Sequence, residues 1–267
     1  MGAEELSRRA FLAVGVSSLA AFPAAASAVP EAQWLGYETR LRDRLADGGG
    51  GAFAQDVAQE ILILTNGARA RAGARACAWS PELARVASAH AADLAERAYI
   101  GHLTPEGFGP SHRVAILARR MIGSASENIA FRETDRGSGA QDVLDIWRAS
   151  PSHWSTLVDP SHACAGYGVV VRGDRLFAVG LYATPGGELA APLPFRLSHE
   201  AELAAAVMRA SPHFDGFSVV DPAGGAGWRL PVAPGQVLVP GVYQLRPRLR
   251  LDARRYEVLS GPIFVKV

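Results

Sequence analysis

Apolar residues recur at helical spacing through most of the first half of the chain and form strand-like runs in much of the second half. Amphipathic patterns predict helices over residues 31–46, 53–71, 112–121, 139–149 and 199–209. A further helix is expected to begin at Ser80, because serine at the N-cap followed by Pro81 is typical of a helix start. The chain therefore combines helices with strands.

Two apolar, β-branched runs predict a β-hairpin. They span residues 167–171 and 175–182 and are joined by the short connection Arg172-Gly173-Asp174. After residue 187 the composition changes to β-type runs punctuated by proline. Residues 188–267 are therefore predicted to form a smaller, mostly β region.

One strand of this region is predicted to have a basic outer face. Apolar residues and arginines alternate over residues 245–251, which is the period-two pattern of a half-buried strand. Pro247 favours the edge of a sheet, because proline cannot donate a backbone hydrogen bond. Arg246, Arg248 and Arg250 are expected either to keep that edge solvated or to meet an anionic envelope polymer or lipid headgroup.

The N-terminus has the features of an export signal. Arg8 and Arg9 directly precede an apolar run over residues 11–26, which ends at the small residues Ala26-Ser27-Ala28. This arrangement predicts a twin-arginine signal over residues 1–28, with cleavage before Val29. The alternative is a membrane anchor, but the apolar run is short for a bilayer span. We therefore expect a periplasmic or extracellular protein without a transmembrane segment in the mature chain.

Charge and motifs exclude several functions. Lysine and arginine total 27 against 26 acidic residues, a net charge of +1, which provides no excess of positive charge for bulk nucleic-acid binding. The sequence contains no P-loop, His-Glu-x-x-His or Gly-x-Ser-x-Gly motif. The four glycines at residues 48–51 lack the context of a dinucleotide site and instead predict a hinge or linker.

The two cysteines suit an oxidising compartment. Cys77 and Cys164 are the whole complement, and this even count predicts one disulfide between them. The alternative is a pair of buried free thiols.

Five short motifs follow one another in the order found in a known family. They are Thr65-Asn66 with Arg69 and Gly73, Trp79-Ser80-Pro81-Glu82-Leu83, residues 101–107 (GHLTPEG), Glu127-Asn128-Ile129-Ala130, and residues 147–153 (WRASPSH). Residues 52–184 thereby resemble the CAP superfamily (cysteine-rich secretory proteins, antigen 5 and pathogenesis-related proteins) in its bacterial SCP-like branch. The resemblance implies an α+β fold, an α-β-α sandwich with an antiparallel sheet. The expected organisation is then an export signal (1–28), an N-terminal helix and glycine linker (29–51), the CAP domain (52–184) and the β-rich region (188–267).

The resemblance also implies a cavity lined by two histidines and two acidic residues, which in some members holds a divalent metal such as zinc. His102, Glu127 and His153 match three of these positions, and Ser150 stands where the second acidic residue is expected. Two imidazoles and a carboxylate suit a divalent ion with free positions for water or ligand. Another histidine, His90, lies on the apolar face of its predicted helix and is expected in the core.

These residues leave three functions open. The first is a non-enzymatic binding module whose cavity takes a divalent metal or a small apolar or envelope-derived ligand. The second is a metal-dependent hydrolase of envelope material, with Glu127 as general base. The alternative for Glu127 is a structural role, in which its carboxylate only organises loops by hydrogen bonding. The third function is an interaction protein in which the β-rich region carries the binding.

Overall fold

The computed structural model describes residues 30–133, 139–222, 227–230 and 237–267. The predicted export signal and its cleavage site lie outside these residues. Within the described part, no helix is long and apolar enough to span a membrane.

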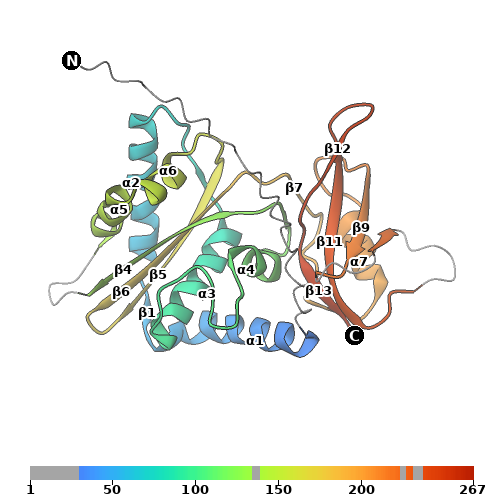
Figure 1. Cartoon of the computed structure of the whole chain (residues 1–267), viewed down its shortest axis with the longest axis horizontal. Coiled ribbons are helices and arrows are strands. Elements are labelled where there is room, and N and C mark those ends of the chain that lie inside the picture. The colour runs from blue at the N-terminus through green and yellow to red at the C-terminus, as the bar shows by residue number, and fades with distance from the viewer. Residues whose placement is uncertain (1–29, 134–138, 223–226, 231–236) are drawn as a thin grey trace, which may run out of the picture.

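An antiparallel sheet forms the centre of the larger unit (Figure 1). Its strands run in the order β1 (Ala52–Phe53), β5 (Cys164–Arg172), β6 (Arg175–Ala183) and β4 (Ser126–Glu133), and β2 (Ala78–Trp79) pairs in parallel with β5. The hairpin predicted from the apolar runs is confirmed, because β5 and β6 pair from Cys164 opposite Ala183 to Arg172 opposite Arg175.

Helices cover both faces of this sheet. One face carries α1 (Glu31–Asp47), α3 (Pro81–Arg97) and α4 (Pro110–Leu117), and the other carries α2 (Gln55–Arg71), α5 (Ala140–Ala149) and α6 (Pro151–Val158). Along β6, Phe177 and Val179 join the core under α3, whereas Leu176 and Ala178 join the core under α2 and α5. This alternation on a strand buried on both faces confirms the predicted α-β-α sandwich.

Helix α3 lies unusually close to β5. A Cβ atom at Gly168 would come within 2.1 Å of the Ser88 backbone nitrogen, so only glycine permits this approach. The helix begins where the sequence predicts, since the Ser80 hydroxyl accepts a hydrogen bond from Leu83 N at 3.3 Å. The predicted helix over 112–121 is shifted, because the observed α4 begins at Pro110 and ends at Leu117.

The expected linker of four glycines is a packed turn. Residues Gly48–Gly50 form a short 3-10 helix between α1 and β1, and Gly49 has a φ of 63°. A Cβ atom at Gly49 would lie 2.0 Å from the Ala92 carbonyl oxygen of α3. The glycines therefore serve close packing of α1 and its turn against α3 rather than a hinge.

A second sheet and one helix form the strand-rich C-terminal region (Figure 1). The sheet order is β10 (Gly227–Leu230), β9 (Gly216–Val220), β11 (Gly241–Arg250), β13 (Ile263–Lys266) and β8 (Arg196–Leu197), with β12 (Tyr256–Val258) paired to β11 and helix α7 (Glu200–Val207) packed against the sheet. A short ladder of β3 (Met121–Ile122) and β7 (Gly187–Glu188) links this region to the sandwich.

The strand with the basic outer face is confirmed, but its predicted edge position is wrong. β11 pairs with β9 on one side and with β13 and β12 on the other. Pro247 is tolerated because it falls between the stretch paired with β13, which ends at Gln244, and the stretch paired with β12, which begins at Arg248. Its carbonyl still accepts a hydrogen bond from Leu259 N at 2.8 Å.

The two units share one core. Phe195, Ile263 and Val265 of the C-terminal region belong to the same buried cluster as α1, α3 and α4. At this junction the Arg119 guanidinium donates to five backbone carbonyls, those of Ala115, Ile116, Leu193, Pro194 and Ile263, at 2.6–3.2 Å. The β-rich region is therefore packed into the sandwich rather than appended to it.

The disulfide predicted between Cys77 and Cys164 is not formed, and both residues are free thiols. Ala78, not Cys77, pairs with Cys164 across β2 and β5. Because successive side chains of a strand point to opposite faces, Cys77 packs in the core under α2 and Cys164 packs against the core under α3. Burial is the main cause that raises the pKa of Cys77, and it raises the pKa of Cys164 to about 11, so both stay protonated at neutral pH.

Candidate functional site

Three segments bring the expected site residues to one region of the sandwich. His102 lies in the loop between α3 and α4, Glu127 is the second residue of β4, and His153 is in the first turn of α6. His102 Nδ1 and Glu127 Oε1 are 2.9 Å apart. Next to Glu127 in β4, the Asn128 side chain donates to the His153 carbonyl at 2.9 Å, which ties α6 to this strand.

A buried arginine completes the group. Arg113 of α4 is fully buried, and its Nη2 donates to Glu127 Oε2 at 2.8 Å, to Oε1 at 3.0 Å and to the His102 carbonyl at 2.9 Å. The Glu127 side chain is only 1% exposed, whereas the His102 side chain is 50% exposed. The buried ion pair thus holds one edge of an imidazole ring whose other half faces solvent.

The charges of this group are mutually stabilised. Burial alone would raise the pKa of Glu127, but the hydrogen bond from His102 and the charge of Arg113 outweigh burial and lower it. The hydrogen bond to Glu127 in turn raises the pKa of His102. Glu127 is therefore ionised at neutral pH, and it fixes His102 Nδ1 as a donor while His102 Nε2 stays outside this network.

His153 and Ser150 lie at the start of α6. Burial lowers the pKa of His153, and the charge of His102 lowers it further, so the two imidazoles interact electrostatically. The Nδ1 atom of His153 is buried and has no hydrogen-bond partner among the described residues. The Ser150 hydroxyl lies 3.1 Å from the Ser152 hydroxyl, and because it is neutral it provides no charge in place of the expected carboxylate.

His90 is a core residue, as the sequence predicts. It is fully buried, its Nε2 lies 3.1 Å from the Gly101 carbonyl, and burial together with the charge of Arg113 lowers its pKa to about 3. The neutral ring therefore donates to the backbone of the loop that carries His102.

This histidine predicts a pH dependence of stability. Because the folded pKa lies below the unfolded value near 6.5, the contribution of His90 is complete above pH 6.5 and declines as the pH falls towards 3. Between pH 7 and pH 5 we expect a loss of up to about 2 kcal/mol that a His90→Gln variant does not show. Urea unfolding of both proteins at the two pH values measures the free energy of unfolding. An equal change between pH 7 and pH 5 in the wild-type protein and the variant would contradict the prediction.

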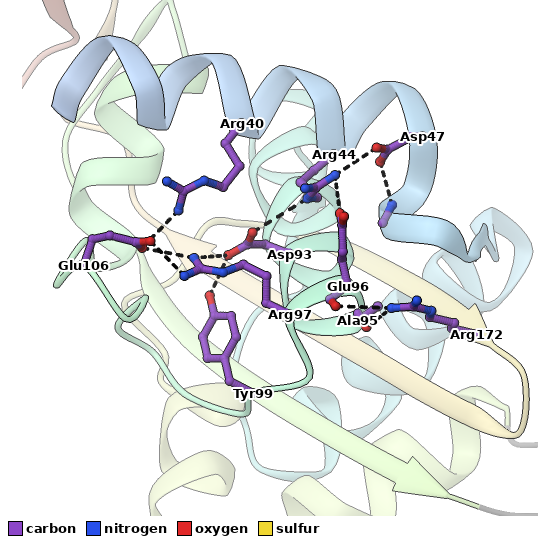
Figure 2. A network of polar contacts seen from close by, with 11 residues as sticks. Arg40, Arg44, Asp47, Asp93, Ala95, Glu96, Arg97, Tyr99, Glu106 and Arg172 are labelled. Atoms are coloured by element: carbon purple, nitrogen blue, oxygen red, sulfur yellow. Dashed lines mark hydrogen bonds and ion pairs between the residues drawn. The ribbon is translucent and has the colours of Figure 1, made fainter. Parts of the chain in front are cut away.

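Helix α1 braces the His102 loop from outside (Figure 2). Glu106 of the loop receives Arg97 of α3 in a bidentate pair at 2.8 and 3.0 Å and Arg40 of α1 at 3.0 Å. On the apolar side, Tyr37 of α1 stacks on Phe108 with ring centroids 4.1 Å apart. The loop is thereby held on both flanks by side chains that include Arg40 and Tyr37 of α1.

Comparison with known proteins fits this arrangement. Residues 62–182 match the model of the cysteine-rich secretory protein family, CAP. This segment belongs to the CAP family. The CAP domain so defined contains His102, Arg113, Glu127, Ser150 and His153. No protein of curated function matches the sequence.

Three solved structures are similar to the chain over about half its length. They are an outer surface protein from Borrelia burgdorferi (19% identity, TM-score 0.45, 51% of this chain and 98% of that one), an extracellular SCP-domain protein from Bacillus anthracis (25%, 0.42, 49% and 41%) and a cysteine-rich secretory protein from Staphylococcus aureus (14%, 0.37, 49% and 39%). The match spans less than half of the Bacillus and Staphylococcus proteins.

The Glu127 carboxylate is not free to bind a metal. No group of three or more His, Cys, Asp or Glu side chains placed to hold a metal occurs among the described residues. Both oxygens of Glu127 already accept hydrogen bonds from Arg113, and one also accepts from His102, so this carboxylate orients the His102 ring. Two imidazole nitrogens take no part in this network, namely His102 Nε2 and the buried His153 Nδ1, which has no hydrogen-bond partner among the described residues.

Arg113 is a site residue that the sequence motifs do not predict. The residues that follow it are apolar, and nothing in the motifs around it marks it as part of the site. A signal was present, because an arginine within an apolar helical stretch must find a buried partner, and Glu127 is one of the acidic residues within the family motifs.

Proposed function

We propose that this is an exported CAP-domain protein of the cell envelope that binds a divalent metal or a small ligand at His102 and His153, without catalysing a reaction. The observation that carries the proposal is the buried Arg113–Glu127 pair, which fixes one nitrogen of a half-exposed imidazole. A pre-oriented, solvent-facing histidine costs little entropy on binding. The export signal predicted at residues 1–28 supports the envelope location.

Zinc suits the donors that remain free. His102 and His153 would hold the ion through one nitrogen each, and Glu127 would keep His102 in the correct tautomer. A bound divalent ion would supply Lewis acidity and open positions for an oxygen-bearing envelope component. Both imidazoles must be neutral to bind, which their different pKa shifts allow near neutral or mildly alkaline pH.

The hydrolase alternative finds less support. A general base needs a free, basic oxygen within reach of water, whereas Glu127 is buried, ion-paired and has a lowered pKa. Ser150 adds no second carboxylate. These residues therefore favour binding over catalysis.

Replacing the histidines tests the proposal. We expect His102→Ala and His153→Ala each to weaken zinc affinity at least about tenfold, because each removes one of two protein ligands. Isothermal titration calorimetry at pH 7.5 measures it, with His213→Ala, a change at an exposed histidine outside the site, as matched control. Wild-type affinity in the double variant would refute the assignment, and so would an equal loss in His213→Ala.

A further inference from the structure

The outer face of the C-terminal sheet contains a pocket that gathers three arginines. The cavity has a volume of about 380 Å3, and its lining includes Arg229, Arg246, Arg248, Ser218 and Tyr256. This pocket lies wholly outside residues 62–182, so the CAP domain does not account for it.

Strand register places the polar groups on one face. Arg229 of β10 and Arg246 of β11 both pair with Ser218 of β9, so they flank it from the two sides. Strands lie about 4.8 Å apart, which puts the two arginines close to 10 Å apart at the backbone with a small hydroxyl side chain between them. Tyr243 and Leu245, which alternate with them along β11, are buried in the core on the opposite face.

Arg248 is the third arginine, two residues along β11 on the same face. Its guanidinium lies over Gly216, where a Cβ atom would come within 3.3 Å of Nη2. It also lies 5.1 Å from the centre of the Tyr256 ring, and its Nε is buried without a hydrogen-bond partner among the described residues. The aromatic ring and the glycine thus fix this cation in place.

Positive charge exceeds negative charge in this pocket. Arg229 has no hydrogen bond or ion pair with any described residue, and Arg246 donates only to the neutral groups of Gln244 and Ser260 at 3.3 and 3.2 Å. Asp215 is the carboxylate of the pocket, and Arg248 shares it with Arg250. Like charges on neighbouring strands repel, so the arrangement favours an anion.

We propose that this pocket binds a phosphate monoester. A phosphate monoester carries a charge of about −1.5 to −2 and three acceptor oxygens, which match several guanidinium groups and the Ser218 hydroxyl. A carboxylate has two oxygens and a single charge, so one arginine suffices for it. The ester is either a soluble molecule or the headgroup of a lipid, because both present the same group.

Glycerol 3-phosphate is the soluble probe, and vesicles of phosphatidylcholine with phosphatidic acid are the lipid probe. We expect the wild-type chain to bind at least one of them and Arg229→Gln and Arg246→Gln each to weaken that binding at least about tenfold. Arg255→Gln is the matched control, since Arg255 is 76% exposed, is paired with Asp252 and does not line the pocket. Binding to glycerol 3-phosphate alone indicates a soluble ligand, and binding to phosphatidic acid vesicles alone indicates a lipid.

Three results would overturn the proposal. They are the absence of binding to both probes, unchanged binding in both pocket variants, and an equal loss in Arg255→Gln, which would indicate diffuse electrostatic attraction. Circular dichroism melting establishes that each variant is folded, and the two pocket variants are independent of each other. The His102→Ala, His153→Ala double variant is expected to bind the glycerol 3-phosphate or phosphatidic acid probe as the wild-type chain does. Failure of the zinc site and failure of this pocket can therefore be told apart.

Discussion

An Arg113→Met variant is expected to lose about 3–5 kcal/mol of stability, because it leaves the Glu127 carboxylate buried without its cation. Methionine fills much of the volume of arginine, so the loss reports the missing charge and hydrogen bonds more than a cavity. The His102 and Phe108 carbonyls also lose a donor, at 2.9 and 3.2 Å in the native protein. Chemical denaturation with fluorescence detection measures the loss.

A double substitution separates charge burial from simple loss of packing. Arg113→Met combined with Glu127→Leu removes both charges, so we expect the double variant to be more stable than Arg113→Met alone. The control is Arg175→Met, which breaks an exposed pair with Glu133 at 3.2 Å and should cost less than about 1 kcal/mol. If the stability loss of the double variant equals the sum of the losses of Arg113→Met and Glu127→Leu measured singly, the ion pair does not hold the site together.

An Arg119→Met variant is expected to lose about 3 kcal/mol or more, because five backbone carbonyls at the junction lose their donor at once. Two of these carbonyls end α4, and the other three belong to the C-terminal region. The thermal unfolding transition should therefore shift to lower temperature and become broader or split, as the sandwich and the second sheet lose a shared anchor.

The neighbouring residue provides the matched control. Arg120 donates to the Leu189 carbonyl at 3.1 Å, but its side chain is 41% exposed and its ion pair with Glu188 faces solvent. Arg120→Met should cost less than about 1 kcal/mol. Equal losses in the two variants would contradict the special role of Arg119, as would an unchanged transition in Arg119→Met.

Local signals in the sequence are sufficient to predict where most of the helices and the central hairpin lie. Apolar periodicity locates α1, α2, α5 and α7, the Ser80-Pro81 cap locates the start of α3, and two apolar runs locate the hairpin of β5 and β6. These elements depend on residues a few positions apart, which is the range over which periodicity and capping act.

Long-range packing cannot be predicted from such local signals. Arg119 and Arg120 are identical neighbours, yet their surroundings differ, because the partners of Arg119 include residues 193, 194 and 263. The cysteine prediction is wrong for a related reason, since a one-residue offset in the pairing of β2 with β5 decides the face on which each thiol lies. At the site, the family motifs give His102, Glu127 and His153, whereas the buried partner of Glu127 comes from a helix without a motif.

The shared core has a consequence for synthesis on the ribosome. Residues 62–182 carry the CAP domain, but Ile263 and Val265 of β13 complete the buried cluster beneath α3 and α4. While translation has not yet reached these residues, a nascent chain holding the whole CAP segment still exposes an apolar surface. We therefore expect its final folding step to follow the synthesis of the C-terminal sheet.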